Sequence, residues 1–387
     1  MEKTKPSPAR LESLDLLRAV AIFLVLGRHL SEGTVAALSG PMQSFVMVWQ
    51  RGGWIGVDLF FVLSGFLISG LLFREHQRFG SIRYGHFLAR RGFKIYPAFY
   101  VMLAVVVGIS LAHGRPFPPW RLLWPELFFV QNYQPAIFPH AWSLAVEEHF
   151  YLLLPLLVIA LGRRRGAPFA ALPWVIGLLA VVTLAVRVVN AQAVEFSHTA
   201  HFFATHLRMD SLFFGVLISW LWHYHGDRLR AFVKTWRWPL GVLAVGLALP
   251  PFVWEVSSGQ HRYLHTFGLT ALYLSAGIVL LLTLRLRTAW RPLSLIGTYS
   301  YSIYLWHLPI RLFSPLWLPA GTPPLTEIAL YMLLSVVFGM FAATLVETPF
   351  LWLRDRLFPT RSRPLSGVAA EKSTASAPAL EIQTAAA

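Results

Sequence analysis

The chain has 387 residues, of which 56% are hydrophobic and only 13% are charged. Soluble domains carry about 45–50% apolar and about 25% charged residues, so this composition excludes a disordered chain and favours a membrane protein. No cysteine is present, which excludes a thiolate nucleophile, a Cys-ligated zinc site and a disulfide-stapled fold. The net charge of +15 would suggest a nucleic-acid partner in a soluble protein, but here the basic residues separate long apolar runs. We therefore expect a lipid bilayer as partner, and no nucleic acid.

Ten segments approach the length of about 20 apolar residues that a transmembrane helix needs. They are residues 14–30, 54–73, 93–112, 142–161, 171–190, 206–224, 238–254, 264–284, 293–313 and 325–346. The first resembles a secretory signal, but Arg18 interrupts it and nine further spans follow, so we predict an uncleaved helix. Residues 120–130 are apolar but only about half as long as a span, which favours an interfacial or re-entrant segment.

The basic residues indicate how these spans are oriented. Short cytoplasmic loops are enriched in Lys and Arg, and with the N-terminus inside, 24 of the 33 basic residues lie in cytoplasmic segments. The predicted fold class is an all-α integral membrane protein with about ten transmembrane helices and both termini cytoplasmic. Residues 1–13 form a cytoplasmic tail and residues 14–358 the transmembrane domain. Residues 359–387, rich in Ala, Ser, Thr and Pro, form a disordered cytoplasmic tail.

Several ionisable residues lie inside the predicted spans, where a charge is costly and indicates function. Arg18 and His29 are eleven residues apart on the first span, so they face nearly the same way about 16 Å apart along the axis. The topology places a second set in the outer half of the membrane: Asp58, Glu147, Glu148, Arg208, Asp210 and, with Tyr304 on the same face, His307. With His29 near the outer end of the first span, five helices thus bring titratable groups to one depth. The alternatives are that some of them only pin helices together, or that His29 meets interfacial water.

Helical spacing limits how these outer groups can combine. Glu147 and Glu148 diverge by 100°, so we expect at most one of them to face a common site. Arg208 and Asp210 point about 200° apart, so we expect them not to pair with each other.

A second basic group opens the third span on the cytoplasmic side. Arg91 and Lys94 are three residues apart, so they share a helix face and could hold a phosphate. The alternative is ordinary topology-setting charge, which is the interpretation we favour for Arg74 and Arg78. Glu347, at the cytoplasmic end of the last span, is expected to be a structural or anchoring residue.

Six motifs occur in order along the chain. They are Arg18 and His29 spaced as Arg-x10-His, GVDLFFVLSGFLI at 56–68, WSLAVEEHFY at 142–151, Arg208-Met-Asp210 followed by Gly215, YSYSIYLWH at 299–307, and ETPF at 347–350. With these motifs the sequence resembles the membrane-bound acyltransferase family 3, the O-acyltransferases of surface polysaccharides and related acceptors. The resemblance covers about residues 11–358.

The resemblance implies a multi-pass enzyme of the bacterial inner (cytoplasmic) membrane. It implies acyl-CoA, usually acetyl-CoA, as co-substrate, no metal, and transfer to a hydroxyl of a carbohydrate or glycolipid on the outer side. Two positions depart from the family pattern, since Lys94 stands where arginine is usual and His149 where glutamine is common. Lysine loses the bidentate fork that arginine offers a phosphate. We expect no extracellular esterase-like domain, and hence no step that relies on one.

These residues predict a mechanism. We expect His29 to act as general base on the acceptor hydroxyl, because an imidazole with a pKa of about 6.5 suits proton transfer near neutrality. Glu147 would orient His29 or stabilise its imidazolium, and Arg18 would face the donor channel. The residues expected to bind the cofactor through its phosphates are Arg90, Arg91 and Lys94. Substrate or oxyanion contacts are expected from Asp58, Tyr151, Arg208, Asp210, Tyr304 and His307.

Three alternatives remain open at this point. An acyl-His29 intermediate is a variant of the same mechanism. A multi-helix transporter or flippase would use the buried Arg, His and Glu residues for coupling, and a membrane-embedded hydrolase would release CoA without acylating an acceptor.

Overall fold

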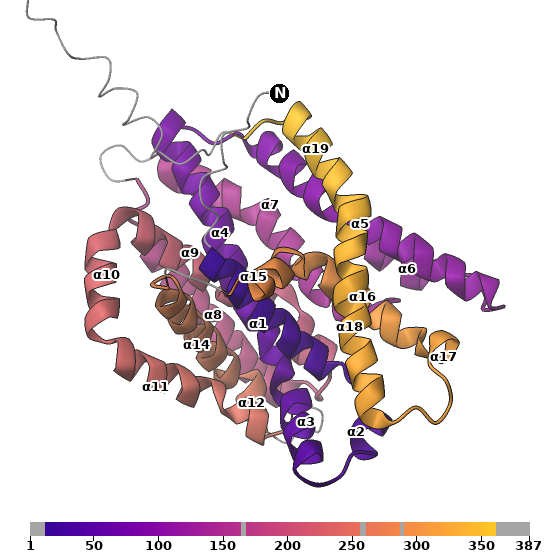
Figure 1. Cartoon of the computed structure of the whole chain (residues 1–387). Coiled ribbons are helices and arrows are strands. Elements are labelled where there is room, and N and C mark those ends of the chain that lie inside the picture. Colours follow the sequence, from indigo (N-terminus) through magenta and orange to yellow (C-terminus); the bar gives the residue numbers. More distant parts are fainter. Residues whose placement is uncertain (1–11, 164–167, 256–260, 287–289, 361–387) are drawn as a thin grey trace, which may run out of the picture.

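The computed structural model describes residues 12–163, 168–255, 261–286 and 290–360, and every regular element within these ranges is a helix (Figure 1). The predicted all-α class is therefore confirmed for this part of the chain. The predicted tails fall almost wholly on residues 1–11 and 361–387, which lie outside the described residues.

The helices are the following, in chain order. The first half contains α1 (Glu12–Arg28), α2 (Glu32–Ala36), α3 (Gly40–Gly52), η1 (Gly53–Ile55), α4 (Gly56–Phe79), α5 (Tyr84–Ala112), α6 (Trp120–Leu127), η2 (Pro139–Ala141), α7 (Trp142–Gly162) and α8 (Leu172–Ala193). The second half begins with η3 (Thr199–Phe203), η4 (Thr205–Leu207), α9 (Met209–Tyr224), α10 (Gly226–Thr235), α11 (Arg237–Ala248), α12 (Pro250–Val253), α13 (Arg262–His265) and α14 (Phe267–Thr283). It ends with α15 (Arg291–Thr298), α16 (Ser300–Leu312), α17 (Ser314–Trp317), α18 (Pro324–Ala342), η5 (Ala343–Glu347) and α19 (Thr348–Leu357).

Five helical segments among the described residues are long and apolar enough to cross a membrane. They are Gly40–Phe79, Tyr84–Ala112, Pro139–Gly162, Leu172–Ala193 and Pro324–Leu357. A sixth is counted if α10 and the helices after it, bent by 81°, form one broken span. The number of ten spans and the cytoplasmic position of both termini therefore remain predictions.

The other predicted spans correspond to shorter helices. α1 and α14 have 17 residues each, α9 has 16 and α16 has 13. At 1.5 Å per residue even the longest of these measures about 26 Å, less than the hydrocarbon thickness of about 30 Å. The predicted span at 293–313 is divided between α15 and α16 at Tyr299.

The helix bounds differ from one sequence-based expectation and agree with another. α5 begins at Tyr84, nine residues before the predicted span, so Arg90, Arg91 and Lys94 belong to the helix itself. The apolar segment at 120–130 forms α6, which has eight residues and a length of about 12 Å, too short to span a bilayer.

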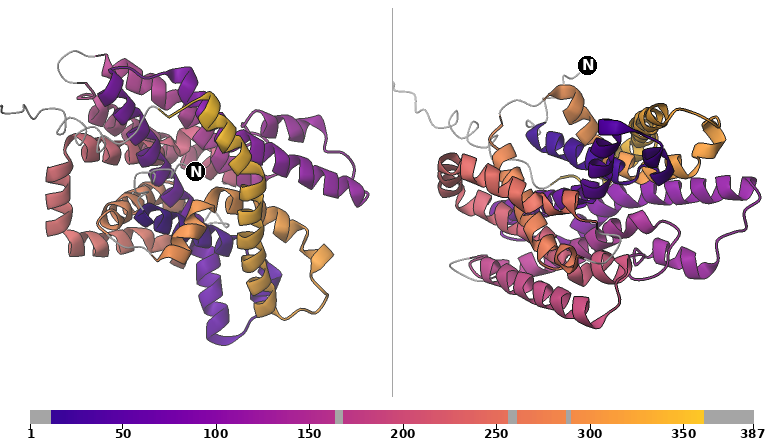
Figure 2. Two further views of the ribbon diagram at one scale, coloured as in Figure 1. Left: turned by 45° about the horizontal axis from the view of Figure 1, so that its top comes forward. Right: turned by 90° about the horizontal axis from the view of Figure 1, so that it is seen from below.

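α4 is the central helix of the bundle. It packs against α9, α1, α14 and α7. In the most apolar window of Gly40–Phe79, 78% of the residues are buried, against 22% for α8 at the periphery. α5 and α6 project from one side of the bundle, to the right in Figures 1 and 2.

Glycines allow α4 to lie directly against α9. A Cβ atom on Gly65 would lie 1.9 Å from the backbone oxygen of Leu212, and one on Gly215 would lie 2.1 Å from that of Val62. Since backbone meets backbone at this crossing, neither position has room for any side chain. Small residues at helix contacts are typical of membrane proteins, where close van der Waals packing drives helix association.

The peripheral helices carry apolar stripes on their exposed faces. The large exposed side chains include Trp174, Leu178 and Val181 on α8, Trp238, Val242 and Val245 on α11, and Leu333, Val337 and Phe341 on α18. Their spacing of three, four or eight residues places each set on one helix face. Outward stripes of this kind are expected where lipid, and not water, surrounds the protein.

The α4–α9 crossing gives a direct test of the packing. We expect Gly215→Ala to lower the free energy of unfolding by about 2–3 kcal/mol, because the added methyl group has no space against a backbone oxygen. Gly177→Ala in α8 is the matched control: its Cβ meets no atom within 4 Å, so the change should be neutral or slightly stabilising. Thermal unfolding in detergent measures both, and equal stability of the two variants would contradict this packing.

Candidate active site

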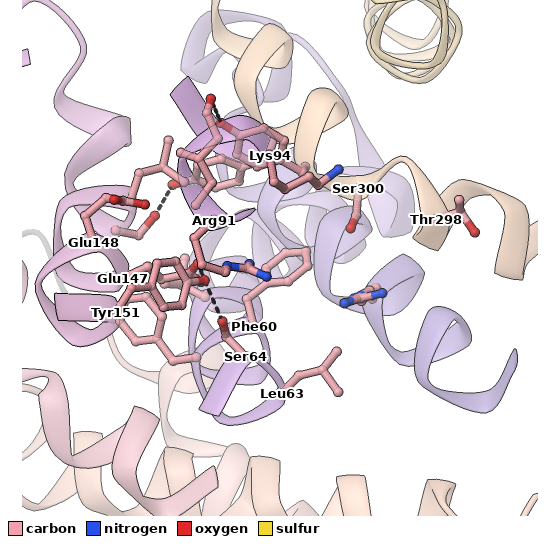
Figure 3. A pocket seen from close by; sticks show the side chains of 18 residues that line it. Phe60, Leu63, Ser64, Arg91, Lys94, Glu147, Glu148, Tyr151, Thr298 and Ser300 are labelled. Carbon is pink, nitrogen blue, oxygen red and sulfur yellow. Dashed lines mark hydrogen bonds between the residues drawn. The ribbon is translucent and has the colours of Figure 1, made fainter. Parts of the chain in front are cut away.

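A first cavity, of about 210 Å³, lies between α1, α4, α5, α7 and α16 (Figure 3). We call it the basic cavity. Its polar and charged lining residues are Arg18, Ser64, Arg91, Lys94, Ser143, Glu147, Glu148, Tyr151, Thr298, Ser300, Tyr301 and Tyr304. α5 thus supplies two cations, Arg91 and Lys94, to a cavity that α7 lines with two carboxylates, Glu147 and Glu148.

Glu147 lies in a hydrogen-bonded chain within the basic cavity. The Tyr151 hydroxyl donates to Glu147 Oε2 at 2.5 Å and lies 2.9 Å from Ser64 Oγ. Because the tyrosine proton goes to the carboxylate, Ser64 is the donor to Tyr151. The guanidinium carbon of Arg91 is 4.7 Å from the centre of the Tyr151 ring, so this cation lies beside the chain (Figure 3).

The two cations from α5 differ in their partners. Lys94 forms an ion pair with Glu347, whose second carboxylate oxygen accepts from Ser302. Arg91 forms no ion pair among the described residues, and its Nε is buried without a hydrogen-bond partner. Arg91 is therefore the cation available to an anionic ligand. Glu347, expected to be an anchoring residue, ties η5 to both α5 and α16.

Arg90 lies elsewhere. It forms an ion pair with Asp355 at 2.9 Å and donates to the backbone oxygen of Phe358, so it fastens α19 to α5 and does not line the cavity. The structure therefore does not bring Arg90, which was expected to bind the cofactor, together with Arg91 and Lys94 in the cavity. Arg18 does line the cavity, with a contact of 2.9 Å to Asp15 one turn earlier on α1.

A second cavity, of about 300 Å³, adjoins the first. We call it the histidine cavity, and its lining residues are Val25, Arg28, His29, Trp54, Val57, Pro139, His140, Trp142, His198, Phe202, Phe203, Arg208, Tyr304 and Leu308. Val57 and Tyr304 line both cavities. Arg18 and His29, eleven residues apart on the first predicted span, line the two adjoining cavities: Arg18 lines the basic cavity and His29 the histidine cavity.

Hydrogen bonds define the protonation of His29. His307 Nδ1 lies 2.5 Å from the backbone oxygen of Tyr304, so Nδ1 carries the proton and Nε2 is an acceptor in neutral His307. His29 Nδ1 lies 3.0 Å from the backbone oxygen of Val25 and 3.2 Å from His307 Nε2, so it also carries the proton. This leaves a lone pair on His29 Nε2, which has no hydrogen-bond partner in the described chain. The ring is held in the state that a general base needs.

This arrangement changes the role expected for Glu147. The group beside the His29 ring is His307, with ring centres 4.9 Å apart, whereas Glu147 is bonded to Tyr151 in the other cavity. Orientation of His29 therefore comes from His307. Glu148 also differs from expectation: it lines the basic cavity together with Glu147, and its Oε2 accepts from Tyr96 at 2.9 Å.

Tyr304 forms part of the wall between the cavities. Its hydroxyl donates to the backbone oxygen of His140 at 2.6 Å and lies 2.7 Å from Ser143 Oγ, which is then the donor. The tyrosine proton is therefore already engaged. As an oxyanion donor, the role expected for it, Tyr304 would first have to release this bond.

Two buried ion pairs lie beside the cavities. Arg208 pairs with Asp58 at 2.9 Å, and Asp210 pairs with Arg187. As expected, Arg208 and Asp210 do not pair with each other. Arg208 lines the histidine cavity, but neither aspartate, although both were expected to contact substrate, lines either cavity. Truncating one partner would leave a buried charge unpaired, at a cost of about 3–5 kcal/mol.

Three residues of this region were not singled out from the sequence as site residues. Arg187 is buried on α8. Its charge inside a predicted span could have marked it as a candidate functional residue. His140 and His198 line the histidine cavity from η2 and from the segment before η3. Both lie outside the predicted spans, so the criterion of an ionisable residue within a span could not identify them. Within the described ranges, no group of three or more His, Asp or Glu residues is arranged to hold a metal ion.

The sequence is similar over most of its length to a family described as an acyltransferase domain, which matches residues 11–344. Peptidoglycan O-acetyltransferase OatA of Listeria monocytogenes is 26% identical over 371 residues, covering 89% of this chain and 56% of the relative. O-acetyltransferase OatA of Staphylococcus aureus is 27% identical over 369 residues, covering 89% and 57%. The chain thus spans little more than half the length of these curated relatives. No solved structure matches it.

The chain belongs to this family of acyltransferases, as its ordered motifs predicted. Family membership together with the long apolar helices makes it a multi-pass membrane protein. The two adjoining cavities are accordingly the candidate active site of an acyltransferase.

Proposed function

We propose that this protein moves an acyl group, most simply acetyl, from acyl-CoA in the basic cavity to a carbohydrate hydroxyl in the histidine cavity. The observation that carries the proposal is the wall of Val57 and Tyr304 that both cavities share. A thioester that reaches this wall from the basic cavity meets an acceptor approaching from the other side. The relatives named O-acetyltransferase support the acyl group and the type of bond formed.

The donor side of the proposal rests on charge. CoA carries several phosphate charges, and Arg91 is a cation of the basic cavity without an ion-pair partner in the described chain. An arginine fork can bind a phosphate through two hydrogen bonds. Lys94 adds positive charge but is already engaged by Glu347, so we assign the larger part of phosphate binding to Arg91.

The acceptor side rests on aromatic surface. Trp142 and Phe203 stack with ring centres 4.9 Å apart and planes at 14°, and Trp54 and Phe202 line the same cavity. Flat aromatic faces suit the apolar faces of sugar rings, while nearby polar groups select among their hydroxyls. One of the relatives is named a peptidoglycan O-acetyltransferase, so a cell-wall glycan is the first acceptor class to test.

The chemistry follows from the histidine pair. His29 Nε2 takes the proton of the acceptor hydroxyl as its oxygen attacks the thioester carbon, and His307 stabilises the imidazolium through its acceptor nitrogen. The carbon–sulfur bond then breaks, and the proton passes to the CoA thiolate. The basic cavity is proposed to face the cytoplasm of a bacterial inner membrane, in keeping with the basic residues of α5.

A transporter or flippase is the alternative from another class, because two cavities in series also suit alternating access. Acetyl-CoA turnover separates the two functions. A transporter would move a substrate without consuming acetyl-CoA, whereas the proposed enzyme releases one CoA for each acyl group transferred.

We expect His29→Ala to lower kcat for acyl transfer from labelled acetyl-CoA by about 10²–10⁴-fold, because the general base is lost. His113→Ala is the matched control. His113 also ends a helix and contacts the backbone oxygen four residues earlier, at 2.9 Å, but it is exposed and outside both cavities. If purified His29→Ala retains wild-type activity and thermal stability, the assignment of the base is wrong.

We expect Arg91→Gln to raise the KM for acetyl-CoA about tenfold or more with a smaller change in kcat, because a charge-assisted phosphate contact is lost. Arg78→Gln removes an exposed arginine near the same end of the bundle and should leave the KM unchanged. Steady-state kinetics with varied acetyl-CoA measures both variants. An equal response of the two would mean that Arg91 contributes only general positive charge.

A further inference from the structure

His140 is a buried imidazole that the mechanism above does not use. It lines the histidine cavity, the residue is only 5% exposed, and neither Nδ1 nor Nε2, both buried, forms a hydrogen bond of normal geometry among the described residues. A neutral imidazole has one N–H donor and one acceptor nitrogen. The backbone oxygen of Leu305 lies near the ring but outside normal hydrogen-bond geometry. Buried polar atoms without partners are rare and costly, and a ligand group is one explanation for their retention.

Neighbouring groups hold His140 in place. The Tyr304 hydroxyl donates to its backbone oxygen at 2.6 Å. Its ring lies edge-on to His307, with centres 5.4 Å apart, and edge-on to Phe138 at 5.8 Å. The ring therefore stands next to the pair formed by His29 and His307 and beside the wall shared by the two cavities.

We propose that the N–H of the His140 imidazole donates a hydrogen bond to the carbonyl oxygen of the acyl group and stabilises the oxyanion formed during transfer. The ligand is thus a thioester carbonyl, and the inference rests on the proposed function. Attack by the acceptor oxygen forms a carbon–oxygen bond while His29 takes the hydroxyl proton. The carbonyl oxygen becomes negatively charged and is held by His140. When the carbon–sulfur bond breaks, the carbonyl re-forms and the CoA thiolate takes the proton from His29.

Two hydroxyl donors of the wall are already engaged. The Tyr304 proton goes to the His140 backbone, and the Ser143 hydroxyl goes to Tyr304. The guanidinium of Arg208 is paired with Asp58 and lies 5.4 Å from the centre of the Trp142 ring. Its Nε, like Trp54 Nε1 in the same cavity, is buried without a hydrogen-bond partner among the described residues. His140 differs from these two donors because its ring packs against His307, beside the proposed base. An oxyanion site requires donors that are in place before the reaction.

The test compares His140→Phe, which keeps the ring and loses the donor, with His140→Asn, which keeps a short N–H donor. Each purified variant is assayed for two reactions: hydrolysis of labelled acetyl-CoA without acceptor, and acetyl transfer to a soluble peptidoglycan disaccharide. An oxyanion forms in both reactions. We expect His140→Phe to lower kcat of both by about 10²–10³-fold with KM values within about threefold, and His140→Asn to recover part of the rate.

Each other outcome overturns the inference in a defined way. Unchanged kcat in His140→Phe shows that His140 is no oxyanion donor. Unchanged hydrolysis with a raised acceptor KM makes it an acceptor contact, and equal losses in both variants with lowered thermal stability make it a structural residue. His113→Phe controls for the loss of an imidazole outside the site. Wild-type protein that turns over no acetyl-CoA would refute the proposed function, whereas an active wild type with an equally active His140→Phe refutes only this inference.

Discussion

The constraint on which this structure depends is that polar groups buried in an apolar bundle need partners. Arg208 with Asp58, and Arg187 with Asp210, form buried ion pairs between α4, α8 and α9. Glycine contacts bring the backbones of α4 and α9 together at the same crossing. With these charges neutralised, the bundle can surround two polar cavities. The side chains that remain without partners beside those cavities then become informative about function.

The sequence predicted the all-α class, the family and several charged residues that line the cavities, among them Arg18, Arg91 and His29, because motifs and embedded charges are local signals. It also predicted correctly that Arg208 and Asp210 do not pair, since angular spacing on a helix is a local property. It did not predict which side chain lies beside His29. Helical spacing gives direction on one helix, whereas the approach of His307 to His29 depends on how α16 packs against α1. The predicted span at 293–313 is longer than the observed helices for a similar reason, because the break between α15 and α16 at Tyr299 depends on packing.

The contrast between Arg90 and Arg91 illustrates the same limit. Both residues are arginines, adjacent on α5. Arg90 nevertheless binds α19 through Asp355, whereas Arg91 lines the basic cavity. A difference of 100° around the helix separates an anchoring role from a proposed donor-binding role. His140 is the converse case. It belongs to a short helix outside the predicted spans, and only burial and the absence of a hydrogen-bond partner among the described residues mark it.

The central claim of the account is that the two cavities form one path, entered by donor and acceptor from opposite sides. Proteoliposomes of defined orientation test it most directly, with labelled acetyl-CoA confined to one side and a peptidoglycan disaccharide confined to the other. The account predicts transfer only when acetyl-CoA is on the side of the basic cavity and the acceptor is on the opposite side. Transfer that requires both substrates on the same side of the membrane would contradict it.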